Sequence, residues 1–278
     1  MKALLLTCFV MIWATSLVNS AHAETPLLLM SYNIRYDNPD DVPPWTERRP
    51  HMAAQIAFND PDIFGVQEAL IPMVGYLTQN LSGYAHYGVG RDDGAEAGET
   101  TTIFYRRDRF ERLSAQTLWC SKTPDRPSKD ADADLPRTFT RLILRDRVSG
   151  QVLDIRNAHF DHKGAQAREN CARQIMALAP APDAFLIIMG DFNTGPKSAP
   201  YRILNAGPLR DARSVSPIVF GPKGTYNGFD IRRTDGEAID HIFIDRRLRV
   251  TRFGTLTDSF EGKVISDHFP LMTEVLLP

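Results

Sequence analysis

Residues 185–196 read FLIIMGDFNTGP, an apolar run that changes abruptly into an acid and an amide. A short apolar run bounded by glycine and proline is typical of a strand that is buried on both faces. Asp191 and Asn193 lie two positions apart, so their side chains point to the same side if the chain is still extended there. This stretch therefore predicts a buried strand that presents two polar side chains at its end.

The same change from apolar to polar residues recurs where other predicted strands end. Charged groups are costly to bury unless they are paired or bind a metal. This recurrence therefore predicts a shared site at one end of a sheet, where the strands terminate. Each residue by itself also has an ordinary explanation, as a turn former, a surface acid, a cap or a structural histidine. The residues are Asn33, Glu68, His159, Asp191, Asn193, Asp240, Asp267 and His268.

The remaining pattern predicts more strands than helices. Several strands are apolar along their whole length and must be covered on both faces, which favours two packed sheets with helices outside them. Helices are predicted after a Thr46 cap, with Pro50 tolerable only in the first turn, then over residues 167–178 and 198–204. The predicted strands are 27–33, 62–69, 101–107, 137–146, 151–160, 184–190, 238–245, 250–258 and 269–277.

Residues 1–23 have the features of a secretory signal, with Lys2, the apolar stretch ALLLTCFVMIWA and an A-x-A motif in SAHAE. The apolar stretch is shorter than the roughly 18 residues of a membrane-spanning helix, and no cationic stop-transfer flank follows it. We expect cleavage after Ala23 and export to the periplasm or the medium, with an uncleaved anchor as the alternative. One domain without a transmembrane segment is expected over residues 24–278.

Composition argues against a dedicated nucleic-acid binder. The chain has 32 basic and 34 acidic residues, and removing residues 1–23 takes away one lysine and no acid, which leaves a net charge of about −3. A basic stripe is absent, so nucleic acid is a less favoured partner. Cys120 and Cys171 remain in a compartment that tolerates disulfides, but their distance in space decides whether they pair. The oligomeric state is not predicted.

Six segments stand in the order found in the endonuclease/exonuclease/phosphatase superfamily, which includes pancreatic-type deoxyribonuclease, and the sequence resembles that family over residues 28–275. The resemblance implies an α/β fold, a four-layer sandwich in which two mixed sheets pack face to face with helices outside. It also implies hydrolysis of phosphate esters by in-line attack of water, with Mg²⁺ or Mn²⁺. The segments are MSYNIRYDNPDD, DIFGVQEA, NAHFDH, IIMGDFN, AIDHIF and SDHFPL.

By the same resemblance, Glu68 is the main metal ligand, with Asn33 and Asp267 close to the same ion. Hard oxygen donors of this kind suit Mg²⁺. Asp191 is expected to orient or deprotonate the attacking water, and Asn193 to hold a phosphate oxygen.

The histidines complete the implied chemistry. Asp240 is expected to pair with the ring of His268 and to favour its cationic form, since a carboxylate fixes the tautomer of an imidazole. His159 would lie opposite and stabilise the same phosphate. For protonation of the leaving oxygen, His159 is preferred over a metal-bound water.

The ester itself is left open. Arg35, Arg91 and Arg137 are candidate phosphate contacts, with structural ion pairing as an equal alternative, and Tyr226 is a candidate stacking residue that could equally be packing. We expect a phosphodiesterase or phosphatase acting on a small molecule, a sugar phosphate or a lipid head group. A secreted magnesium-dependent nuclease is the alternative, and a non-catalytic binding protein is a remote one.

Overall fold

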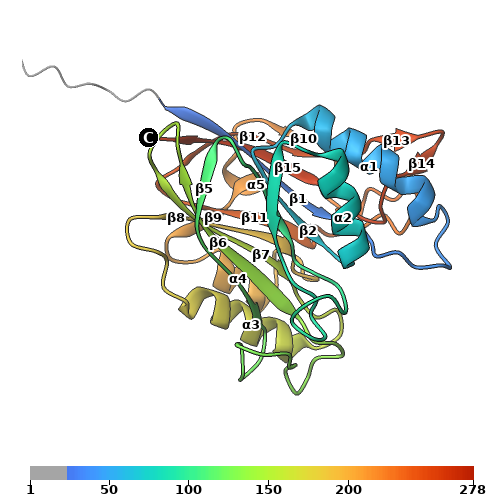
Figure 1. The fold of residues 1–278 in the computed structure, drawn as a ribbon, viewed down its shortest axis with the longest axis horizontal. Coiled ribbons are helices and arrows are strands. Elements are labelled where there is room, and N and C mark those ends of the chain that lie inside the picture. Colours follow the sequence, from blue (N-terminus) through green and yellow to red (C-terminus); the bar gives the residue numbers. More distant parts are fainter. Residues whose placement is uncertain (1–23) are drawn as a thin grey trace, which may run out of the picture.

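The computed structural model describes residues 24–278, in which two β-sheets pack face to face (Figure 1). The predicted signal sequence lies in residues 1–23, outside the described residues. The seven-stranded sheet has the order β10 (Val219–Phe220), β12 (Arg249–Thr255), β15 (Leu271–Leu277), β1 (Thr25–Asn33), β2 (Ile63–Gln67), β4 (Ile103–Arg106) and β3 (Tyr84–Tyr87). The six-stranded sheet has the order β5 (Phe110–Trp119), β6 (Thr138–Asp146), β7 (Val152–His159), β8 (Phe185–Asp191), β11 (Asp240–Asp245) and β9 (Leu209–Asp211).

Both sheets are mixed. Strand β1 pairs in parallel with β2 and antiparallel with β15, and β7 pairs in parallel with β8 and antiparallel with β6. A small separate sheet is formed by β13 (Ser259–Phe260) and β14 (Lys263–Val264). Strands β1, β7 and β8 end in Asn33, His159 and Asp191, and Glu68 directly follows β2. Each pair of parallel strands therefore delivers polar residues to one edge of its sheet.

Helices cover the outer faces of the two sheets (Figure 1). Helices α1 (Trp45–Asn59) and α2 (Ile71–Asn80) pack through residues such as Ile56 and Leu77 on the seven-stranded sheet. Helices α3 (Ala165–Ala177) and α4 (Ala199–Leu204) pack on the six-stranded sheet, and α5 (Ala212–Val215) is a single turn after β9. The predicted four-layer α/β sandwich is therefore confirmed.

The layer between the sheets changes from apolar to polar along the strands. Alternate residues of a strand point to the same face, so each inward row can be followed directly from the sequence. In β1, β2, β7 and β8 these rows begin with buried aliphatic or aromatic side chains of the central core and end in polar ones. The rows are Leu27-Leu29-Ser31-Asn33, Ile63-Gly65-Gln67, Leu153-Ile155-Asn157-His159 and Phe185-Ile187-Met189-Asp191.

The start of the first helix differs from the prediction. Helix α1 begins at Trp45, one residue after Pro44, and no side chain caps it. Thr46 therefore lies inside the helix, and Pro50 lies in the helix interior rather than in the first turn. Pro50 has no backbone N–H for the carbonyl of Thr46, and burial of Trp45, Met52 and Ile56 against the sheet outweighs this loss.

Other elements were not predicted, among them α2 and β5. Strand β5 is exposed or half-buried along most of its length and carries no clear alternation, so the period-two pattern is weak there. Cys120, directly after β5, forms a disulfide with Cys171 in α3. This decides the pairing that the sequence leaves open. Among the described residues, no helix is long and apolar enough to cross a bilayer.

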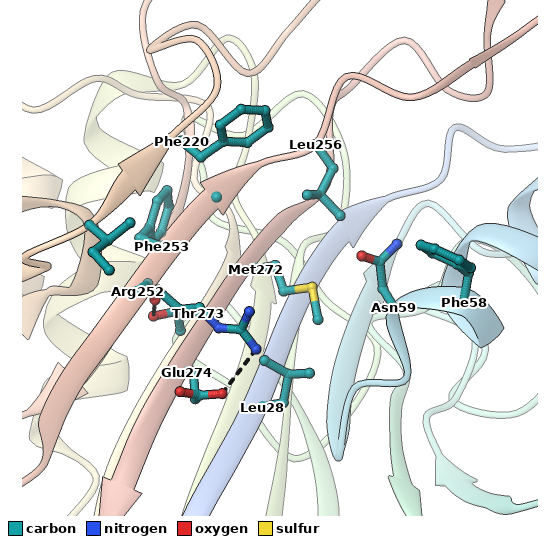
Figure 2. A pocket seen from close by; sticks show the side chains of 12 residues that line it. Leu28, Phe58, Asn59, Phe220, Arg252, Phe253, Leu256, Met272, Thr273 and Glu274 are labelled. Atoms are coloured by element: carbon teal, nitrogen blue, oxygen red, sulfur yellow. Dashed lines mark hydrogen bonds and ion pairs between the residues drawn. The ribbon is translucent and has the colours of Figure 1, made fainter.

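An apolar groove of about 430 Å³ lies on the seven-stranded sheet, between the end of α1 and strands β10 and β12, and Figure 2 shows the side chains that line it. Phe58 and Phe220, which are 90% and 69% exposed, flank it. Its charged side chains, Arg252 and Glu274, form an ion pair of 3.0 Å with each other. Both groups of potential metal ligands found within residues 24–278 lie outside this groove.

Candidate active site

A second pocket, of about 490 Å³, lies at the polar end of the inter-sheet layer. Asn33 and Asp240 lie behind its wall, and each is hydrogen-bonded to a residue that lines it. Arg91 is not part of this wall. The predicted site residues that line the pocket are Arg35, Glu68, Arg137, His159, Asp191, Asn193, Tyr226, Asp267 and His268.

Asn33 connects the two sheets at the base of the pocket. Its Nδ2 donates to Oε1 of Glu68 at 3.0 Å, directly after the neighbouring strand β2, and to Oδ2 of Asp191 at 2.9 Å, at the end of β8 on the other sheet. Its Oδ1 accepts from the backbone N–H of Arg35 at 3.0 Å. Asn33 therefore lies beside the predicted metal ligand and holds two carboxylates together.

Three residues of the site have left-handed backbone conformations within two residues of the end of a strand. Arg35, Glu68 and Asn193 have φ values of 52°, 63° and 49°. A non-glycine residue with positive φ is uncommon, and such conformations gather where the surrounding structure holds a functional side chain in place. The backbone turns sharply at these positions, so each side chain leaves the direction of its strand and reaches the pocket.

His268 and Asp240 form the predicted pair. Nδ1 of His268 lies 2.9 Å from Oδ2 of Asp240, and both side chains are buried. Burial alone would lower the pKa of His268, but the carboxylates of Asp240 and Asp191 outweigh it and place this pKa well above 6.5. The ring is therefore cationic at neutral pH, with Nε2 3.8 Å from Oδ2 of Asp191.

The carboxylates of the pocket are difficult to ionise. Burial, together with the charge of Asp240, raises the pKa of Asp191 to about 7. Burial, with a smaller contribution from Glu68, raises the pKa of Asp267 to about 6. These carboxylates lack sufficient positive charge nearby when the protein contains no metal.

A bound divalent cation would supply this positive charge. Oxygen and imidazole ligand atoms of Glu68, His159 and Asp191 lie within 4.8 Å of one another, and the same holds for Asp191, Asp240 and His268. Two carboxylates in the first group match the hard donors that Mg²⁺ and Mn²⁺ prefer. The second group already contains a carboxylate paired to a cationic imidazole, so the first group is the better metal site.

Glu99 is a site residue that the sequence reasoning missed. It lines the pocket, its Oε2 lies 2.6 Å from Nη1 of Arg91, and it lies 3.7 Å from Nδ1 of His159. Burial and the charge of Glu68 raise the pKa of Glu99 to about 6. Glu99 follows Gly98 in a loop, so it does not share the pattern of polar residues at the ends of apolar strands.

Arg137 lies against His159. Its Nη1 is 3.1 Å from both ring nitrogens, so it faces the ring rather than one nitrogen in the ring plane, and its Nη2 lies 3.0 Å from Nδ1 of His162. Burial, and then the charges of Arg137 and Arg91, place the pKa of His159 well below 6.5. A neutral His159 is poorly suited to deliver a proton to a leaving oxygen. His162 was not predicted to belong to the site.

The other predicted substrate contacts have different environments. Arg35 pairs with Asp41 at 2.8 Å and lies about 4 Å from Glu68 and Asp267. Arg91 is buried against Glu99, so it supports the wall from behind. The ring of Tyr226 packs edge-on against His268, with centroids 5.1 Å apart.

Comparison with known proteins agrees with this geometry. The chain is similar to the structure of an endonuclease/exonuclease/phosphatase family protein from Bacteroides thetaiotaomicron, with 34% identity, a TM-score of 0.88, and coverage of 92% of this chain and 99% of that one. It is also similar to a mannosyl-6-phosphatase from the same organism, with 34% identity, a TM-score of 0.86, and coverage of 90% and 100%.

A further relative is the carbon catabolite repressor protein 4 homolog 1 of Arabidopsis thaliana, which is 25% identical over 237 residues, or 68% of this chain and 39% of that protein. The chain thus spans about two fifths of the length of this curated relative. Residues 30–268 match the Endonuclease/Exonuclease/phosphatase family. On this match, which includes the whole pocket, the chain belongs to the endonuclease/exonuclease/phosphatase family of hydrolases, whose substrates are phosphate esters.

Proposed function

We propose that this protein is a metal-dependent phosphatase that releases phosphate from a sugar phosphate. The observation that carries the proposal is the pocket, in which buried carboxylates face a cationic His268 and a buried Arg137. The similarity to a mannosyl-6-phosphatase over nine tenths of the chain supports a sugar phosphate as the substrate.

Glu68 would hold the ion, with Asp191 and His159 offering further ligand atoms and Asp267 nearby. A bound divalent ion would supply positive charge to the phosphate oxygens and to the attacking water. Mg²⁺ and Mn²⁺ are the proposed ions, because the donors are mostly carboxylate oxygens.

Asp191 positions the attacking water and accepts its proton. Without a metal, burial and the charge of Asp240 raise the pKa of Asp191 to about 7. A bound divalent ion would lower this pKa and keep the carboxylate ionised, so that it can accept a proton. Asn193 donates one amide hydrogen to the carbonyl of Phe160, which leaves the other for a phosphate oxygen. Cationic His268, held by Asp240, neutralises the charge that develops on the phosphate.

The rim of the pocket suits a ring-shaped leaving group better than a polymer. Tyr36 and Tyr226 line it together with the apolar side chains Leu135 and Ile239. Aromatic side chains that combine an apolar face with a hydroxyl group suit the faces and hydroxyls of a sugar. The acidic net charge of −2 for the whole chain also favours a small ester over nucleic acid.

The test is a panel of esters offered to the purified chain of residues 24–278 with Mg²⁺, with Mn²⁺ and with EDTA. We expect phosphate release from mannose 6-phosphate and p-nitrophenyl phosphate, and little cleavage of bis-(p-nitrophenyl) phosphate, plasmid DNA, RNA or sphingomyelin. Asp191→Asn is the inactive variant, and Glu274→Gln, which changes an ion pair outside the pocket, is the matched control. DNA cleavage that falls steeply with salt would instead identify a nuclease.

The proposed place of action is outside the cytoplasm, as a single domain of residues 24–278. The Cys120–Cys171 disulfide supports this, because structural disulfides persist mainly in oxidising compartments. N-terminal sequencing of the exported protein should begin at Glu24. A sequence that begins at Met1 would contradict cleavage after Ala23.

A further inference from the structure

Two buried amide side chains join the sheets directly beneath the pocket. Nε2 of Gln67, on β2, donates to Oδ1 of Asn157, on β7, at 2.6 Å. Nδ2 of Asn157 donates to the backbone carbonyls of Val66 at 2.9 Å and Thr102 at 3.1 Å. Both side chains are fully buried. Asn157 thus uses both amide hydrogens to hold the backbone of the opposite sheet.

The Gln67–Asn157 pair lies next to residues of the proposed metal site. Gln67 directly precedes Glu68, and Asn157 lies two residues before His159 on the same face of β7. His159 is paired in register with Asp191 on the neighbouring strand. The pair therefore lies between the apolar core and the pocket, next to the residues that the two sheets contribute to the proposed metal site.

Gly65 makes room for Asn157. A Cβ atom at position 65 would lie 2.6 Å from Cγ and 2.7 Å from Oδ1 of Asn157, closer than real Cβ contacts. The nearest atoms are all from the Asn157 side chain. The absence of a side chain at Gly65 therefore leaves the space that the amide of Asn157 occupies. The two sheets approach each other closely here.

We propose that Gln67 and Asn157 are positioning residues that set the separation of Glu68 from His159 and Asp191, and so the geometry of the metal site. The inference rests on the proposed function. Mg²⁺ requires near-ideal octahedral ligand geometry at about 2.0–2.1 Å. Partners that orient metal ligands typically change metal affinity by about 10–100-fold when they are mutated.

The first test measures Mn²⁺ binding to the metal-free protein by electron paramagnetic resonance, together with unfolding in urea. Asn157→Ala should weaken Mn²⁺ binding at least about tenfold and lower kcat more than it raises KM. Ile155→Ala is the matched control, because it lies two residues earlier on the same inward row, in the apolar layer. It should destabilise the fold and leave the Mn²⁺ affinity within about twofold.

The second test is a double-mutant cycle. Gly65→Ala alone should weaken Mn²⁺ binding, because its methyl group displaces Asn157. In the Asn157→Ala background the same change should have little effect, since the atoms it would meet are gone. If Asn157→Ala does not fold, Gln67→Met tests the same pair, because Asn157 keeps both carbonyl bonds and loses one partner. It should weaken Mn²⁺ binding several-fold.

Equal changes in Mn²⁺ affinity for Asn157→Ala and Ile155→Ala, or strictly additive effects in the cycle, would overturn the positioning role. A parent protein that binds no Mn²⁺ would also overturn it. If the Mn²⁺ differences appear but no ester is hydrolysed, the proposed function fails and the positioning role stands.

Discussion

Replacing Asp191 by asparagine should make the metal-free protein less sensitive to pH. Asp191 is buried, and both of its carboxylate oxygens accept hydrogen bonds, from the side chain of Asn33 and the backbone of Asn193. These bonds do not compensate for burial and for the charge of Asp240, so the pKa of Asp191 rises from 3.8 to about 7. Asparagine imitates the protonated carboxyl group and cannot ionise.

The sign of the effect follows from proton binding. Between pH 3.8 and about 7 the native protein holds a proton on Asp191 that the unfolded chain has released, so stability falls as pH rises. A difference of one in pKa corresponds to about 1.4 kcal/mol. From pH 5 to pH 8 the wild-type protein should therefore lose about 3 kcal/mol of stability that Asp191→Asn retains.

The measurement is urea unfolding in EDTA at pH 5, 6, 7 and 8, for both proteins. The raised pKa of His268 also lowers stability above pH 6.5, and Asp191 contributes to that raised pKa. The difference between the two proteins therefore reports the ionisation of Asp191 together with its effect on His268, and the wild-type slope alone does not isolate it. The difference should grow by about 3 kcal/mol and level off above pH 7. Parallel stability curves would show that Asp191 is already ionised at pH 5 and would refute the reasoning.

Three further predictions concern the site and the disulfide. His268→Ala should lower kcat about 100-fold, because it removes a cationic donor near the phosphate, and a phosphate-release rate within threefold of wild type would contradict this. Mn²⁺ affinity should fall from pH 8 to pH 5.5, because protons compete with the ion for Asp191 and Asp267, whose pKa values are about 7 and 6. A Mn²⁺ affinity that isothermal titration calorimetry finds to be independent of pH would argue against these two carboxylates as ligands. Replacing both Cys120 and Cys171 by alanine opens a loop of 51 residues and should lower the free energy of unfolding by up to about 4 kcal/mol. Unfolding in urea should then have its midpoint at a lower urea concentration. An unchanged midpoint would show that the disulfide does not stabilise the fold.

Much of the candidate site follows from local sequence patterns. Inward rows such as Phe185-Ile187-Met189-Asp191 change from apolar to polar at a strand end, and a period of two is a property of the extended chain itself. For this reason the polar residues that follow buried strands could be identified together, and all of them except Asn33 and Asp240 line the pocket.

Residues outside that pattern could be assigned to the site only from the tertiary structure. Glu99 reaches the pocket from a loop, and its partner Arg91 lies behind it rather than facing a substrate. Helix α1 also begins earlier than expected, because tertiary burial of Trp45 outweighs the preference of Thr46 for a cap position.

The sequence by itself determined that buried strands end in acids, amides and histidines, since alternation and burial are encoded within a few neighbouring residues. The tertiary structure alone decided which strands adjoin, that Cys120 meets Cys171, and that Gln67 on one sheet bonds Asn157 on the other across 90 positions of chain. Contacts between distant residues depend on how whole sheets pack. Every residue has a backbone carbonyl, so the sequence does not indicate which carbonyls Asn157 binds.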